Sequence, residues 1–206
     1  MTRRVVLIDY GAGNIRSVAN ALRAAGADNI VISATADAVL SADHIVLPGV
    51  GAFGACVAAL RARDGLVDAL ESRVRQGGVP FLGICVGMQL LAEHGEEHGS
   101  HRGLGWIGGT VQPMAPADPS VRIPHMGWND VIPARDHPLI HAGEAYFLHG
   151  YHMVATNPAH IIANSAHGGP IVAAVGHGNI AGVQFHPEKS QTFGIALLER
   201  FLAWRP

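Results

Sequence analysis

The sequence predicts an α/β fold in which a central, mainly parallel sheet is flanked by helices, with additional antiparallel strands in the C-terminal half. Two observations lead to this prediction. Short apolar runs alternate with helical patterns up to residue 91, whereas later apolar runs are separated by Gly, Pro and Asn. Hydrophobic residues make up 49% of the chain and charged residues only 15%, which suits a sheet buried on both faces.

The predicted elements of the first half follow one another with short connections. The strands cover residues 5–9, 30–33, 44–47 and 81–84. One helix is expected from the turn at 10–14 to residue 25, and a second from 54 to 75 with an interruption near Gly65. A third helix is expected directly after Cys85. Such alternation is typical of an open parallel sheet, whose ligands bind beyond the carboxyl ends of the strands.

The second half is predicted to add mainly antiparallel strands and a closing helix. Its apolar runs cover residues 107–111, 131–132, 146–148, 161–162, 171–175 and 180–185. Residues 191–204 carry apolar side chains at helical spacing and are expected to pack on the sheet. No repeat or low-complexity linker separates the two halves, so we expect one domain over residues 1–206.

Charge and composition argue against several classes of partner. The chain has 14 basic and 16 acidic side chains, a formal net charge of −2 and no run of Lys or Arg. We therefore expect neither nucleic acid nor a membrane as a partner. No signal peptide is recognisable, and the longest charge-free run, 161–185, is broken by Pro170 and several glycines. We expect a cytoplasmic protein in which Cys56 and Cys85 stay reduced.

Cys85 lies at a predicted strand-to-helix turn, with a glycine two residues away on either side. This is the layout of a nucleophile elbow, in which Gly83 and Gly87 would let the chain reverse tightly and sulfur replaces the serine oxygen. The start of the helix would favour the thiolate, and the amide of Val86 would point to where an oxyanion forms. The alternative is a small buried cysteine that only packs.

Two other segments are expected at the same edge of the sheet. Asp9 and Tyr10 end the first strand, and residues 48–51 follow the third. Because glycines flank Val50, its peptide can adopt unusual dihedral angles and could aim a second amide at the oxyanion. The alternative for this loop is an ordinary Pro-Gly turn.

His186 is the best candidate for a general base among the 13 histidines. It ends an apolar strand, and Pro187 keeps the segment extended, so that residues two apart point to the same side. His186 and Glu188 can therefore project together. The carboxylate could accept a hydrogen bond from one imidazole nitrogen and leave the other facing Cys85.

Neither a metal nor a cofactor is expected. The glycines at 11–13 could suggest a dinucleotide site, but Arg16 stands where that fingerprint has its third glycine. His94, His98 and His101 lie in a glycine-rich stretch without the ordered spacing and rigid frame of a zinc site, and we expect a solvated loop there.

Five motifs together resemble those of class I, triad-type glutamine amidotransferases. They are IDYGAGN at 8–14, LPGVGAF at 47–53, GICVGMQ at 83–89, PHMGWN at 124–129 and FHPEKS at 185–190. They stand in the family's order over nearly the whole chain. Within the class, Met88-Gln89 and the loop at 48–51 most closely resemble the glutaminase subunits of imidazole-glycerol-phosphate synthases. The resemblance implies a flavodoxin-like fold.

The resemblance also implies roles for individual residues. The catalytic triad would consist of Cys85, His186 and Glu188. The oxyanion hole would be formed at Val50, Gly51 and Val86, and L-glutamine would be held by Gly51, Gln89, Glu97, Gly150 and Tyr151. The chain has His149-Gly150-Tyr151, followed by His152, where the family usually has Ser or Thr in the middle position. Because the family uses the backbone there, we expect binding to survive, and both histidines could line the pocket.

The implied reaction is hydrolysis of L-glutamine to glutamate and ammonia through a cysteine thioester. By resemblance, the ammonia passes to a cyclase subunit in a heterodimer, which makes imidazole glycerol phosphate and aminoimidazole carboxamide ribonucleotide in histidine biosynthesis. The residues agree, because no phosphate loop, metal cluster or basic patch remains to bind an ammonia acceptor. Asn14, Trp128 and Lys189 would face the partner; alternatively, Trp128 lies in the core and Lys189 is merely solvated.

Three other hypotheses remain open. A free-standing cysteine hydrolase would share the elbow but need no partner. A binding module without activity is disfavoured, because Cys85, His186 and Glu188 are all present. A paralogue could supply ammonia to a different synthetase. A subunit that supplies ammonia to a partner should also hydrolyse little glutamine alone. The peptide of Val50 is a candidate switch for this activity.

Overall fold

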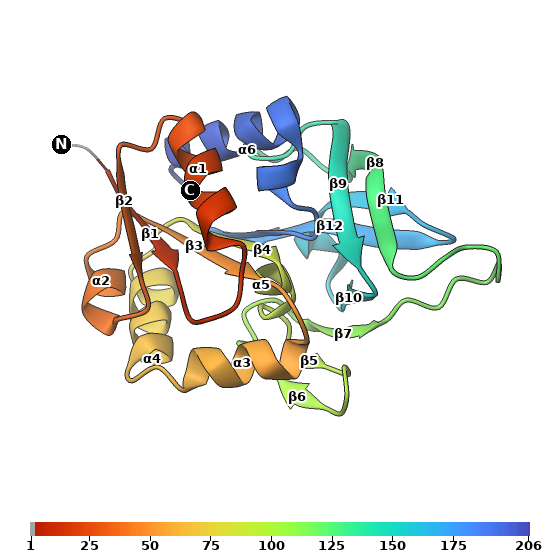
Figure 1. Ribbon diagram of the computed structural model, residues 1–206, viewed down its shortest axis with the longest axis horizontal. Helices are drawn as coiled ribbons and strands as arrows, with labels where there is room; N and C mark the ends of the chain where they lie inside the picture. The colour runs from red at the N-terminus through yellow and green to blue at the C-terminus, as the bar shows by residue number, and fades with distance from the viewer. Residues whose placement is uncertain (1–2) are drawn as a thin grey trace.

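Five strands form the parallel half of the main sheet in the computed structural model, which describes residues 3–206 (Figure 1). They are, in spatial order, β2 (Asn29–Ser33), β1 (Arg4–Ile8), β3 (His44–Gly49), β4 (Phe81–Cys85) and β13 (Ile180–Val183). All four pairings between them are parallel. Every residue of β3 and β4 is buried, as expected of strands covered on both faces. The parallel sheet predicted from the apolar runs is confirmed.

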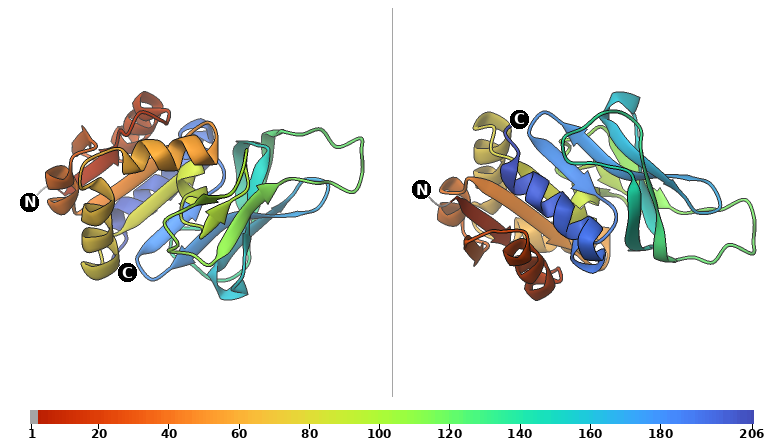
Figure 2. Two further views of the ribbon diagram at one scale, coloured as in Figure 1. Left: turned by 90° about the horizontal axis from the view of Figure 1, so that it is seen from below. Right: turned by 90° about the horizontal axis from the view of Figure 1, so that it is seen from above.

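The same sheet continues with four antiparallel strands. These are β12 (Pro170–His177), β11 (Ile161–Ala166), β8 (His125–Pro133) and β9 (Gly143–His149). A second, four-stranded sheet consists of β10 (Tyr151–Ala155), β7 (Gly109–Pro113), β5 (His94–Gly95) and β6 (His101–Arg102). The loop between β7 and β8 extends away from both sheets (Figure 2). The mainly antiparallel strands predicted for the second half are thus also confirmed.

Helices cover both faces of the parallel half. On one face, α1 (Ile15–Ala24) lies beside α6 (Gln191–Ala203), and on the other lie α3 (Phe53–Arg61) and α4 (Leu66–Leu70) (Figure 1). The helix α4 continues into the π-helical turn η1 (Glu71–Gln76). The break between α3 and α4 falls at Gly65, whose φ is +66°. Within residues 3–206, no helix has the length and apolarity to cross a membrane.

Several elements differ from the sequence-based expectation. The helix expected after Cys85 is a single turn, α5 (Val86–Gln89), so its end charge is smaller than that of a long helix. The helix α2 (Ala36–Leu40) and the strands β5, β6 and β10 were not expected; the two shorter strands have two residues each. Strand β8 is nine residues long, although only residues 131–132 were predicted. Its other inward positions are polar, glycine or proline, so they give no apolar signal.

Two 3₁₀ turns complete the chain, η2 (Pro158–His160) and η3 (Pro187–Lys189). The second lies between β13 and α6. It contains Glu188 and directly follows His186, the predicted general base. Gly194 of α6 allows this turn to pack closely, because a Cβ at this position would lie 1.9 Å from the carbonyl oxygen of Pro187. The helix therefore fixes the position of the turn beside the end of β13.

The turn between β4 and α5 depends on two glycines. Cys85 adopts φ 54° and ψ −113°, a conformation that costs energy for a residue with a side chain. A Cβ on Gly83 would lie 2.5 Å from the carbonyl oxygen of Gly87, and a Cβ on Gly87 would lie 1.8 Å from that of Leu47. The turn therefore packs against both itself and β3 without room for a methyl group.

Replacing Gly87 with Ala is expected to destabilise the fold by more than about 3 kcal/mol, because the new methyl group would collide with backbone that cannot move independently. Urea unfolding of purified protein measures this change. Gly169→Ala is the matched control, since a Cβ there meets nothing within 4 Å. Equal stability of the two variants would contradict the steric argument.

Candidate active site

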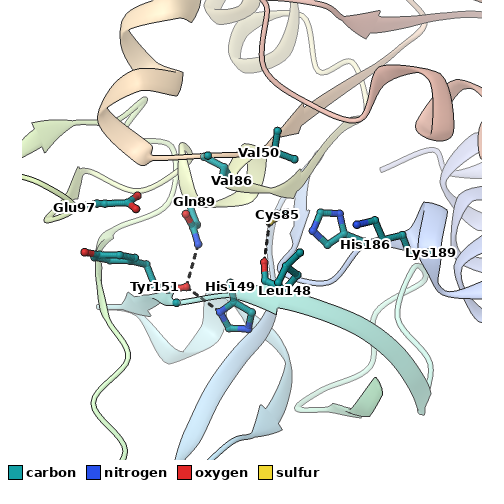
Figure 3. Close-up of a pocket in the computed structure, with 12 residues that line it drawn as sticks. Val50, Cys85, Val86, Gln89, Glu97, Leu148, His149, Tyr151, His186 and Lys189 are labelled. Carbon is teal, nitrogen blue, oxygen red and sulfur yellow. Dashed lines mark hydrogen bonds between the residues drawn. The ribbon is translucent and has the colours of Figure 1, made fainter. Parts of the chain in front are cut away.

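A solvent-open cavity of about 180 Å³ lies at the carboxyl ends of β3 and β4 (Figure 3). Its lining consists of Val50, Gly51, Cys85, Val86, Gln89, Glu97, Leu148, His149, Gly150, Tyr151, His186 and Lys189. The structure thus brings together Cys85, His186 and every residue predicted for the oxyanion hole and for glutamine. Glu188 lies behind His186. Segments from both halves of the chain are needed to build this one cavity.

Cys85 is buried but faces the cavity. Its thiol points at the carbonyl oxygen of Leu148, 4.0 Å away, and the side-chain nitrogen Nε2 of Gln184 lies 3.8 Å from its sulfur (Figure 3). Gln184 is completely buried and was not identified from the sequence. The available signal was an amide side chain within an otherwise apolar strand, because such a residue needs a buried partner.

His186, directly before η3, forms a buried pair with Glu188 of that turn. The Nδ1 atom of His186 lies 2.8 Å from Oε1 of Glu188, and the two side chains are only 4% and 1% exposed. Because the carboxylate accepts from Nδ1–H, Nε2 is left to face Cys85. Burial lowers the pKa of His186, but its hydrogen bonds and charge interactions with Cys85 and Glu188 outweigh burial and raise the pKa to about 9. A protonated imidazole is therefore available beside the sulfur at neutral pH.

The loop after β3 packs directly on the elbow. A Cβ on Gly49 would lie 2.7 Å from the backbone nitrogen of Gly87 and 2.8 Å from Cβ of Val86. Gly51 has a φ of +95°, which favours glycine. The carbonyl oxygen of Val50 accepts a hydrogen bond from the thiol of Cys56 at 3.3 Å. The thiol of Cys56 thus anchors the loop by a hydrogen bond to its backbone. Val50 and Val86 lie on the same wall of the cavity (Figure 3).

Gln89 and Glu97 present oxygen atoms to the cavity. The Nε2 atom of Gln89 donates to the carbonyl oxygen of Tyr151 at 3.1 Å and to Oε1 of Gln184 at 3.0 Å. Both of its hydrogens are therefore used by the protein, and its carbonyl oxygen is left for a ligand. Glu97 accepts from the backbone nitrogen of Phe53 at 2.7 Å. Two acceptors on one side of a cavity suit a positively charged amino group.

Of the residues predicted to face a partner, Lys189 lines the cavity and Trp128 is exposed. Trp128 is 48% exposed and stands edge-on to Tyr146, so the alternative that it lies in the core is wrong. Lys189 lies over the ring of Tyr146, 5.6 Å from its centre, and also lines the cavity. Met126, on the same outward side of β8, is 67% exposed. Asn14 directly precedes α1 and makes no side-chain hydrogen bond to that helix.

The other candidate histidines lie in different parts of the structure. His149 lines the cavity, whereas His152 lines a neighbouring hollow with His167. His94 and His101 begin the short strands β5 and β6. Within residues 3–206, no group of three or more His, Cys, Asp and Glu side chains is placed to hold a metal ion.

Comparisons with known proteins agree with this geometry. The model of the family described as glutamine amidotransferase class-I matches residues 6–204. The chain is 58% identical to imidazole glycerol phosphate synthase subunit HisH of Zymomonas mobilis, over 98% of this chain and 96% of the relative. It is 50% identical to the HisH subunit of Rhodospirillum rubrum, over 98% and 100% of the two chains.

Solved structures support the fold. A glutamine amidotransferase crystal structure aligns over 97% of both chains with a TM-score of 0.74 and 20% identity. A chain in the structure of PurLQS from Thermotoga maritima aligns over 98% of this chain and 99% of that chain, with a TM-score of 0.74 and 19% identity. At such identities the likeness concerns the arrangement of helices and strands alone.

The raised pKa of His186 predicts that stability falls with increasing pH. Because the folded-state value of about 9 exceeds the usual 6.5, protonated His186 stabilises the fold fully below the lower value, and this contribution disappears as the pH rises through the higher one. Urea unfolding should show a loss of roughly 1 to 3 kcal/mol across this window. The loss should be smaller in His186→Asn; an equal loss in both proteins would refute the prediction.

Proposed function

Because this chain belongs to the class I glutamine amidotransferase family, we propose that it hydrolyses L-glutamine as the glutaminase subunit of an imidazole glycerol phosphate synthase. The observation that carries the proposal is the placement of Cys85 on a strained turn in the same cavity as the buried His186–Glu188 pair. Relatives named HisH that match nearly the full chain support this reading over a free-standing hydrolase.

The proposed chemistry passes through a covalent thioester. The thiolate of Cys85 attacks the side-chain amide carbon of glutamine, and backbone amides at Val86 and in the Val50–Gly51 loop stabilise the oxyanion. His186 gives its proton to the departing nitrogen, which leaves as ammonia. The neutral imidazole then takes a proton from water, which attacks the thioester and releases glutamate and the thiolate. Glu188 holds the imidazole in the required orientation throughout.

We propose that the substrate amino group is recognised on the wall formed by Gln89 and Glu97. The free carbonyl oxygen of Gln89 and the carboxylate of Glu97 are both acceptors, and glutamine carries a positively charged α-amino group at neutral pH. The backbone at Gly150 and Tyr151 forms the facing wall. The cavity thus offers acceptors for one end of glutamine and Cys85 for the other.

The ammonia is proposed to pass to a cyclase subunit in a heterodimer, which forms imidazole glycerol phosphate and aminoimidazole carboxamide ribonucleotide in histidine biosynthesis. Ammonia released into water at neutral pH would be protonated and would lose its nucleophilicity. Asn14, Trp128 and Lys189 are proposed to face this partner. Exposed Trp128 and Met126 support an interface, because large apolar side chains grouped on one surface mark binding sites.

Replacing Cys85 with Ala should reduce glutamate release by the heterodimer at least about a thousandfold, because no other group can form the thioester. Glutamate is measured with the cyclase subunit and its nucleotide substrate present. Cyclisation fed with ammonium salts is the internal control and should persist in this variant, since the partner's chemistry is untouched. Substantial glutamate release without Cys85 would refute the proposed nucleophile.

Gly150→Ser should leave the KM for glutamine within about twofold of the parent value, a change below about 0.5 kcal/mol. Gly150 lacks the positive φ that favours glycine, and a Cβ there would lie an ordinary 3.5 Å from Cγ2 of Ile123. The position therefore tolerates a side chain while the backbone stays in place. A large rise in KM, measured by steady-state kinetics of the heterodimer, would show that glycine itself is required.

A further inference from the structure

Four groups form a continuous chain of hydrogen bonds that leads to the wall of the cavity. Asn129 contacts His125 through Nδ2 and Nε2 at 3.0 Å. His125 contacts His149 through Nδ1 and Nε2, also at 3.0 Å, and Nδ1 of His149 lies 2.9 Å from the carbonyl oxygen of Tyr151. We refer to Asn129, His125, His149 and the Tyr151 carbonyl as the histidine relay. Three strands, β8, β9 and β10, contribute to it.

The partners at the two ends fix the direction of every bond in the histidine relay. A carbonyl oxygen can only accept, so Nδ1 of His149 carries the hydrogen and Nε2 of a neutral His149 is an acceptor. His125 must then donate from Nδ1, which leaves its own Nε2 to accept from the amide of Asn129. Burial lowers the pKa of His149 to about 3 and that of His125 to about 4, so both rings stay neutral at physiological pH.

The Asn129 end is anchored to the backbone. Its amide nitrogen also donates to the carbonyl oxygen of Ala166 on β11 at 2.8 Å, and its side-chain oxygen accepts from the backbone nitrogen of Asp130 at 2.8 Å. The asparagine amide therefore cannot rotate without losing these bonds. The histidine relay thus starts at a fixed donor and ends at the Tyr151 carbonyl.

The far end of the histidine relay meets the proposed substrate site. The Tyr151 carbonyl accepts from both His149 and Gln89, and Figure 3 shows the two donors converging on it. Together with Oε1 of Gln184, which accepts the other hydrogen of Gln89 Nε2, it sets the orientation of the Gln89 amide. Because a carbonyl attracts only the NH₂ group, the side-chain oxygen of Gln89 is left for the ligand.

We propose that His149, supported by His125 and Asn129, is a positioning residue for substrate glutamine, which it serves by fixing the Tyr151 carbonyl and thereby the orientation of the Gln89 amide. This inference rests on the proposed glutaminase function. The two buried imidazoles do not only satisfy each other's hydrogen-bonding groups. Their hydrogen bonds run in one fixed direction, and the last of them is donated to the Tyr151 carbonyl on the wall of the cavity. His149 touches neither the sulfur nor the scissile amide, so its loss should affect binding rather than the chemical step.

The test is the steady-state kinetics of glutamine hydrolysis by the heterodimer. In His149→Ala, the KM for glutamine should rise about tenfold with kcat within about threefold of the parent, the size expected for one lost buried hydrogen bond. In His149→Asn, KM should stay within about threefold, because the amide nitrogen of asparagine can occupy the place of Nδ1 and donate to Tyr151. Buried His44, which contacts Phe201 and Arg205, provides the matched control. His44→Ala should leave KM unchanged.

Each failure has a distinct meaning. A parent heterodimer that releases no glutamate would refute the proposed function itself. An active parent whose KM is unchanged in His149→Ala would refute the positioning role alone, as would equal KM increases in the alanine and asparagine variants. Asn129 is only half-buried, so Asn129→Ala remains informative if His149→Ala does not fold. It should raise KM about threefold by weakening the histidine relay, and an unchanged KM would overturn the proposal.

Discussion

The site depends on the close contact between the backbone of Gly87 and that of Leu47. This contact is possible only without a side chain at position 87, and it brings the elbow against the end of β3. The same packing places Val86 beside Gly49, so the nucleophile and the proposed oxyanion loop are aligned by one steric constraint. The strained backbone at Cys85 is held in place by the buried strands on either side, β3 and β13.

The C-terminal half supplies the groups that the elbow lacks. Glu188 comes from η3 and His186 directly precedes it, and α6 packs against this turn through Gly194. The opposite wall, residues 148–151, runs from β9 of the large sheet into β10 of the small one. Because the cavity lies between these segments, its lining draws on both sheets. Strand β8 combines two roles, with His125 facing inward and exposed Met126 and Trp128 facing out.

Much of this arrangement could be predicted from the sequence, for identifiable reasons. Continuous apolar runs marked the parallel strands, and paired glycines marked the turn at Cys85. The shared side of His186 and Glu188 followed from the extended backbone before Pro187. Other features depend on long-range pairing: His125 lies opposite His149 only through the register of β8 with β9. Gln184 and α2 gave no periodic signal, and the length of α5 could not be inferred because the apolar pattern continued through Leu91.

The most direct test of the central claim, that the elbow makes Cys85 the nucleophile of a glutaminase, is to trap the covalent intermediate. The heterodimer would be mixed with glutamine and quenched with acid, and its peptides would be analysed by mass spectrometry. We predict a γ-glutamyl group on the peptide that contains Cys85, and none on the peptide with Cys56, whose thiol is buried against Val50. Glutamate formation with the glutamyl group on another residue would contradict the account.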